Sequence, residues 1–172
     1  MNIQDLRNEL SRKLNAARPE RYTNSAWVDE VADQIALDDI QRQQAARDYV
    51  RQVARDVEGK ATRSANRLMR DFHRKQCLPL DWAQYLSAPI AIVNVVIVDG
   101  KPRKVHERVR LADATPTDFE LWAETENAAR ERDYRARGES VSGMSEVAAL
   151  MRAAGAVNFL KWAESTQESK AA

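Results

Sequence analysis

The feature that most constrains the fold is a β-hairpin signal in the middle of a chain whose other periodicities are helical. Residues 90–98 read IAIVNVVIV, a run rich in β-branched residues, and Asp99-Gly100 follows at once. An Asp-Gly pair beside such a run is the strongest short-range signal for a two-residue hairpin turn. The segment from Lys104 to Leu111 alternates polar and apolar residues, and we therefore predict it to be the return strand.

Helical spacing dominates the rest of the chain. Before the hairpin, Gly59 is predicted to end one helix and so to separate it from the next. After the hairpin, Thr115-Pro116 predicts the start of a helix that runs to about Arg137 and stops at Gly138. The expected helices cover about residues 2–16, 27–35, 38–58, 61–75, 115–137, 142–155 and 157–163, with a short helical turn at 81–86.

These elements predict an α+β fold that is mainly α. A length of 172 residues fits one domain, or one domain with a small appendage. We divide the chain into a helical domain with a helix-turn-helix-like unit at residues 1–88, a β-hairpin at 89–112, a C-terminal helical segment at 113–165 and a frayed tail at 166–172.

Composition excludes several classes of protein. A single Cys cannot form a disulfide framework within the chain, and it fits a reducing cytosol. The longest apolar run, residues 89–98, is too short to cross a bilayer. The first residues lack the apolar centre of a signal peptide. We therefore expect a cytoplasmic protein with no membrane partner.

No catalytic or metal-binding constellation stands out, so we expect neither an enzyme nor a cofactor. His73 and Cys77 lie four residues apart and could share a metal on one helix face. A structural zinc site needs four ligands, and the chain offers one further His, His106, and no second Cys. The five glycines are scattered and form no phosphate-binding loop.

The charges are distributed unevenly, although 27 basic residues nearly balance 26 acidic ones. Glu58–Cys77 holds six basic against two acidic residues, and Lys101–Arg110 holds five against one. The rest of the chain is therefore acidic. Two basic islands on an acidic body favour a polyanionic partner more than the net charge of +1 suggests.

The first island places four arginines on one face of a helix: Arg63, Arg67, Arg70 and Arg74. Their spacing of four, three and four residues puts the side chains within about 60° of one another around the helix axis. Such a face either contacts nucleic-acid phosphates and groove edges or is an ordinary solvated surface. On the first interpretation the contacting residues are Lys60, Thr62, Arg63, Ser64, Asn66, Arg67, Arg70 and Arg74.

The second island lies on the predicted return strand. Every second residue from Lys104 to Arg110 is basic or His, so these side chains share one face of the strand. A basic β-ribbon either clamps the DNA backbone beside the helix or protects a sheet edge from pairing. On the first interpretation the contacting residues are Lys101, Arg103, Lys104, Arg108 and Arg110.

The order of a helix, a Gly turn, a basic helix and a hairpin resembles that of a winged helix. Residues 50–68, VRQVARDVEGKATRSANRL, resemble a helix-turn-helix with Gly59 in the turn and residues 62–70 as the recognition helix. The stretches TRSANRLMRDF, LPLDW and RLADATPTDFELWA resemble uncharacterised small proteins of actinobacterial phages, some of them described as DNA-binding. The resemblance implies a DNA-binding protein of phage type.

The first strand of the hairpin is apolar on both faces, because residues 90, 92, 96 and 98 face one side and residues 91, 93, 95 and 97 face the other. Such a strand must be covered on both sides. Helices on one side, with a partner chain or the C-terminal helices on the other, would cover it. We therefore expect a homodimer, which would also double the basic surface.

Two hypotheses of function follow. The first is a double-stranded DNA-binding protein, a phage-type transcriptional regulator in the host cytoplasm, with no catalytic or metal site. Neutralising about five phosphates predicts a log–log salt slope of roughly −4 to −5. The second is a protein-interaction module that binds a host or phage protein and has no nucleic-acid role. Its support is the doubly apolar strand and the charged second half of the helix predicted at 115–137.

Overall fold

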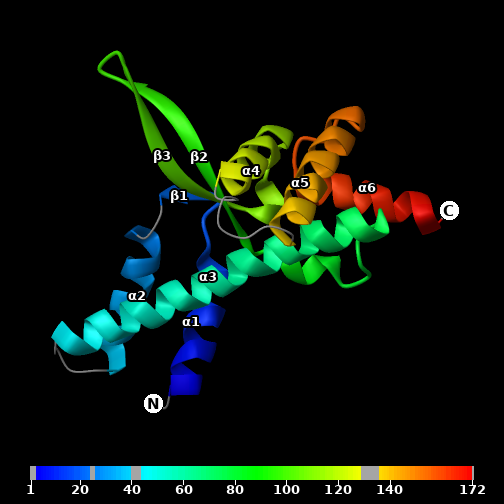
Figure 1. The fold of residues 1–172 in the computed structure, drawn as a ribbon. Helices are drawn as coiled ribbons and strands as arrows, with labels where there is room; N and C mark the ends of the chain where they lie inside the picture. The colour runs from blue at the N-terminus through cyan, green and yellow to red at the C-terminus, as the bar shows by residue number, and fades with distance from the viewer. Residues whose placement is uncertain (1–2, 24–25, 40–43, 129–135, 172) are drawn as a thin grey trace.

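The computed structural model describes residues 3–23, 26–39, 44–128 and 136–171 (Figure 1). In these residues the chain is mainly helical and holds one three-stranded antiparallel sheet, which confirms the α+β, mainly α class. The elements are α1 (Ile3–Ala17), β1 (Arg21–Thr23), α2 (Ala26–Asp39), α3 (Gln44–Lys75), β2 (Pro89–Val98), β3 (Lys101–Arg110), α4 (Pro116–Ala128), α5 (Ala136–Ala153) and α6 (Phe159–Ala171), with 3₁₀ turns at Trp82–Tyr85 and Leu111–Asp113.

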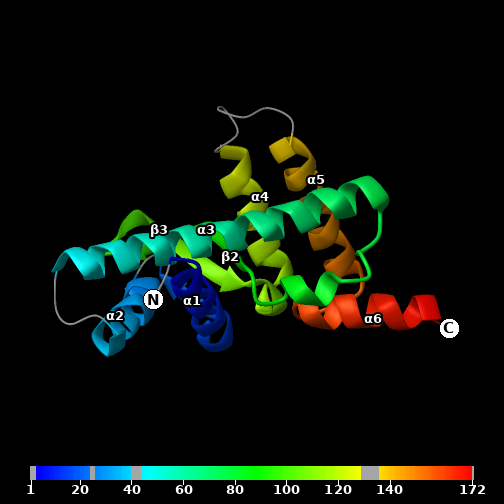
Figure 2. The same cartoon turned by 90° about the horizontal axis from the view of Figure 1, so that it is seen from below.

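Helix α3 is the axis of the molecule, a single helix of 32 residues that crosses the whole structure (Figure 2). Gly59 lies inside it. The predicted helix stop at Gly59, the helix-turn-helix-like unit and the winged-helix arrangement are therefore wrong. A glycine within a helix costs only about 0.5–1 kcal/mol relative to alanine. That cost is outweighed here because the buried face continues on both sides of Gly59, from Ala54 to Ala65.

Gly59 provides a test of this continuity. A Cβ atom built at Gly59 would lie 3.6 Å from Nη1 of Arg63, which is ordinary van der Waals contact. We expect Gly59→Ala to raise the free energy of unfolding by about 0.5–1 kcal/mol, because alanine restricts the unfolded chain and favours helix. Urea unfolding followed by circular dichroism measures the change. A loss of stability would indicate that Gly59 adopts a turn conformation that alanine cannot.

A buried ion pair ties the N-terminal elements to α3. The side chains of Arg18 and Glu58 are 1% and 3% exposed, and Nη2 of Arg18 lies 2.5 Å from a carboxylate oxygen of Glu58. The hydroxyl of Tyr22 on β1 donates to the other oxygen, and Arg18 also donates to the carbonyl of Ser87. Burial, with the Glu58 carboxylate beside it, raises the pKa of Tyr22 above its ordinary value. Glu58, one of the two acids of the first basic island, thus points inward and is paired with Arg18, so it does not offset the arginines outside.

The predicted β-hairpin is confirmed. Strand β2 pairs with β3 from Pro89 opposite Arg110 to Val98 opposite Lys101. Asp99 and Gly100 both have positive φ, as a type I′ turn requires. The short strand β1, which the sequence did not indicate, adds to the other side of β3, so the order is β1-β3-β2.

Two predictions for the C-terminal part are wrong. Gly138 was expected to stop a helix but lies within α5, near its start. The tail predicted to be frayed from residue 166 continues α6 to Ala171. Between α4 and α5, residues 129–135 lie outside the described residues. Most of the charged second half of the helix predicted at 115–137 belongs to this segment. The helical start at Pro116 is confirmed, with Thr115 and Asp118 bonding each other as a cap.

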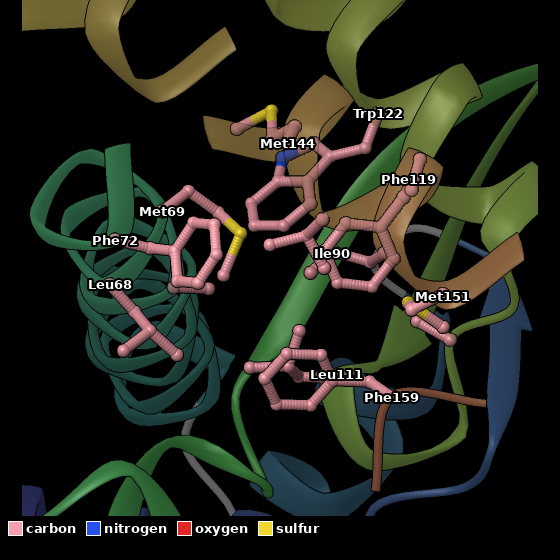
Figure 3. Close-up of a cluster of buried hydrophobic side chains, with 14 of the residues drawn as sticks. Leu68, Met69, Phe72, Ile90, Leu111, Phe119, Trp122, Met144, Met151 and Phe159 are labelled. Atoms are coloured by element: carbon pink, nitrogen blue, oxygen red, sulfur yellow. The ribbon is translucent and has the colours of Figure 1, made fainter. Parts of the chain in front are cut away.

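The larger hydrophobic core lies between the second half of α3, the base of the sheet and the helices α4 to α6. Figure 3 shows Leu68, Met69 and Phe72 on α3 facing Ile90 of β2, with Trp122 of α4 beside them. A second core joins α1, α2 and β1 to the first half of α3. Helix α3 thus belongs to both cores and fixes the sheet and α5 relative to its own arginine face.

Candidate nucleic-acid interface

The arginine face of α3 opens into a cleft with a volume of about 720 Å³. Helix α3 supplies most of the lining of this cleft, and β3, α4 and α5 lie on the same side of α3 (Figure 1). The lining residues are Gly59, Thr62, Arg63, Ser64, Asn66, Arg67 and Arg70 from α3, Arg108 from β3, Glu126 from α4 and Ser140 from α5. The structure thus brings six predicted residues of the basic helix together with one of the basic ribbon.

Four arginines line the cleft, three of them from α3. Arg63, Arg67 and Arg70 make no ion pair with any residue that the structure describes, and Arg63 and Arg67 are exposed. The acid that lines the cleft, Glu126, accepts a hydrogen bond of 3.1 Å from Nδ2 of Asn66. Charges of one sign that line a concave site raise the local concentration of anions. The cleft therefore has the electrostatics of an anion-binding surface.

Arg108 is the one residue of the basic ribbon that reaches the cleft. Its Nη1 donates a hydrogen bond of 2.7 Å to the hydroxyl of Thr62, which in turn donates to the carbonyl of Glu58 at 3.1 Å. This chain of bonds fixes the guanidinium of Arg108 against α3. The cations from two elements that are distant in the sequence therefore line one concavity.

Two of the predicted residues are engaged elsewhere. Arg74 forms an ion pair of 2.6 Å with Glu139 at the start of α5, and it lies outside the lining of the cleft. Arg110 pairs with Asp113 in the following turn, and that contact raises the pKa of the Arg110 guanidinium further. Both guanidiniums are already neutralised by a carboxylate of the same chain.

The remaining predicted residues lie on neighbouring surfaces. Lys60 lines a separate cleft of about 360 Å³ between α1 and α3, together with Arg7. Lys101, Arg103 and Lys104 are exposed near the tip of the hairpin. Arg108 lies six positions after Pro102 along β3, so the tip is about 20 Å from the cleft at roughly 3.3 Å per residue.

Glu126 and Ser140 are cleft residues that sequence reasoning missed. Ser140 is almost fully buried, and its hydroxyl donates a 3.0 Å hydrogen bond to the backbone carbonyl of Asn66. Ser140 belongs to no charge run or motif, and Glu126 is one of several acids in a charged stretch. Only the packing of α4 and α5 beside α3 places the two residues here. No local signal in the sequence could have found them.

The doubly apolar strand is covered along its inner half. Ile90 and Ile92 are fully buried in the larger core with residues of α3 and α4. The outer half is not covered by any described residue to the same extent, because Val95 is 56% and Ile97 is 69% exposed. Within β2, the exposed large apolar side chains are thus those of the outer half, Val95, Ile97 and Val98.

Of the residues considered for metal binding, His73 is engaged by a carboxylate of the same chain. Nδ1 of His73 lies 2.7 Å from a carboxylate oxygen of Glu146, so this pair joins α3 to α5. Within the described residues no group of three His, Cys, Asp or Glu side chains could hold a metal ion. None of the helices that the structure describes is long and apolar enough to cross a membrane.

Comparison of the chain with protein-family models, with curated proteins and with solved structures gives no match.

Proposed function

We propose that this protein binds double-stranded DNA by seating the phosphate backbone against the cleft of α3 and β3. The observation that carries the proposal is the set of three arginines, Arg63, Arg67 and Arg70, that face the cleft without an ion-pair partner among the described residues. Guanidinium groups suit phosphate because their donors form a planar fork. We further propose a phage-type transcriptional regulator that works in the cytoplasm of a host.

The shape of the cleft favours phosphate contacts over the reading of base edges. Helix α3 is its floor and is flanked by β3, α4 and α5, so it does not project as a recognition helix must to enter a major groove. From Arg63 to Arg70 the helix rises about 10 Å, which is the axial rise of about three nucleotides in one strand of B-DNA. Contacts of this kind position a protein and carry little sequence information.

The lining also favours duplex over single-stranded nucleic acid. Proteins that bind single strands stack the bases on aromatic side chains. No aromatic residue lines the cleft in the described part of the chain, where the lining is Arg, Ser, Thr, Asn, Gly and one Glu. A duplex presents phosphates and keeps its bases stacked internally, so it is the form that this surface fits.

Fluorescence anisotropy with a duplex and with one of its single strands tests the proposal. We expect the duplex to bind at least about tenfold more tightly, because the cleft offers phosphate contacts and no stacking platform. Binding should weaken steeply as the salt concentration rises. Equal affinity for the two forms, or binding that is indifferent to salt, would contradict the proposal.

The second candidate function is a protein-interaction module, and the exposed outer half of β2 is the observation that favours it. An acidic partner protein would also fit the cleft. If this second function is correct, the protein does not bind DNA under conditions in which it binds a partner protein with an acidic surface.

A further inference from the structure

The end of the hairpin combines exposed apolar and exposed basic side chains. Figure 1 shows β2 and β3 extending well beyond the helices before they reach the turn. Ile97 is 69% exposed near the end of β2, and Lys101, Arg103 and Lys104 are exposed on β3. Asp99 in the turn is the one acidic residue of this outer segment, residues 95–104.

The register of the hairpin places an apolar pair next to the last residue pair before the turn. Ile97 lies opposite Pro102, with Val98 opposite Lys101 on one side and Val96 opposite Arg103 on the other. Ile97 and Pro102 therefore share one face, with Lys104 two residues further along β3 on the same face, whereas Lys101 and Arg103 point to the opposite face. Proline has no backbone N–H, so its ring can leave water without losing a hydrogen bond there.

Two backbone N–H groups on the free edge of β2 already have hydrogen-bond acceptors within the chain. The backbone N–H of Val93 donates to the hydroxyl of Thr125 on α4, at 2.9 Å. The N–H of Val95 donates to the side-chain oxygen of Asn94, also at 2.9 Å. Strand addition by a peptide or by a second copy of the chain needs such edge donors. Engagement of these two donors makes the middle of the β2 edge less available to an added strand, whereas the apolar face of the tip is exposed.

We infer that the tip of the hairpin is a wedge that inserts Ile97 and Pro102 at a base step from the minor groove and bends the duplex. The inference rests on the proposed DNA binding and adds a deformation to it. Lys101, Arg103 and Lys104 contact the phosphates on either side of the step. Apolar side chains of this kind unstack a base step and kink DNA by roughly 20–90° when basic residues hold the backbone around them.

The separation of the two surfaces sets where the bend lies. Pro102 is about 20 Å from Arg108 along β3, and B-DNA rises about 3.4 Å per base pair. The kink is therefore about six base pairs from the phosphates that the cleft holds. Flexible steps such as TA and CA/TG lower the cost of the deformation, so they are the preferred place for the wedge.

Energy transfer between dyes at the two ends of a duplex of about 30 base pairs measures the bend, because that length is far below the persistence length of about 150 base pairs. The wild-type protein is expected to raise the transfer efficiency at saturating concentration. The variant Ile97→Ser/Pro102→Ser should bind within about tenfold of the wild type and leave the duplex straight. Val157→Ser, which changes a residue with 70% exposure far from the hairpin in sequence, is the matched control and should bend DNA normally.

The outcomes separate the inference from the proposed function. Binding by the wild type without a bend, or an equal bend by the Ile97→Ser/Pro102→Ser variant, overturns the wedge and leaves DNA binding intact. Absence of binding by the wild type overturns the proposed function and the wedge with it. A change in molar mass on light scattering, from dimer in the wild type to monomer in the double variant, assigns the tip to a dimer contact and also overturns the wedge.

Discussion

Gly143→Ala is expected to lower the free energy of unfolding by about 3 kcal/mol, the upper end of the range of about 1–3 kcal/mol that is typical of overpacking in a core. A Cβ atom at Gly143 would lie 2.0 Å from the backbone carbonyl oxygen of Met69 and 2.7 Å from its carbon. Both atoms belong to the backbone of α3, so no side chain can turn aside to make room. Helix α5 would have to move away from α3 at a point where Met144 and Val147 are fully buried.

Urea unfolding at 25 °C measures this effect, and Gly59→Ala is its matched control. The same glycine-to-alanine change has space on α3 and none on α5, so the two variants should shift the unfolding midpoint in opposite directions. A Gly143→Ala protein within about 0.5 kcal/mol of the wild type would show that α5 does not cross α3 at this residue. The wall of the cleft that Ser140 provides would then also be misplaced.

Replacement of the three cleft arginines is the second change with a large expected effect. Arg63→Gln/Arg67→Gln/Arg70→Gln should weaken duplex binding by about 100-fold at 0.1 M salt. A solvated arginine–phosphate contact contributes about 1 kcal/mol, and three of them give about 3 kcal/mol. Glutamine removes the charge and leaves a shorter but still polar side chain, and the three residues make no ion pair with the described residues, so folding should be preserved.

The control for this variant removes three positive charges from other surfaces. Arg12, Arg55 and Arg152 are exposed arginines outside the cleft, each in an ion pair with a carboxylate of the same chain. Their replacement by glutamine changes the net charge equally and should reduce affinity by less than about threefold. Equal losses in the two triple variants would mean that net charge, and not the cleft, governs binding.

Local chemistry explains why some elements could be predicted. The hairpin follows from Asp99 and Gly100, which tolerate the positive φ that its turn demands. The start of α4 follows in the same way from the cap formed by Thr115 and Asp118. The continuity of α3 could not be predicted, because the preference of glycine for helix ends is outweighed by contacts between distant residues. One of them is the buried pair of Glu58 with Arg18.

The candidate site likewise has a part that local sequence signals predict and a part that depends on tertiary contacts. The alignment of Arg63, Arg67 and Arg70 depends only on helical spacing, and the sequence therefore indicated it. Arg74 follows the same spacing but meets Glu139, because α5 crosses α3 there. Arg108 was expected to act beside the helix, and its hydrogen bond to Thr62 depends on how the sheet sits on α3. Tertiary packing therefore determines which arginines of this face have an ion-pair partner among the described residues.

The salt dependence of duplex affinity in the wild type and in the Arg63→Gln/Arg67→Gln/Arg70→Gln variant tests most directly whether the cleft binds phosphates. Each phosphate that a cation neutralises contributes about −0.9 to the slope of log K against log salt concentration. A wild-type slope of roughly −4 to −5 should fall to about −2 in the variant, since three of about five contacts are lost. An unchanged slope would contradict phosphate binding by the cleft, even if the variant bound DNA less tightly.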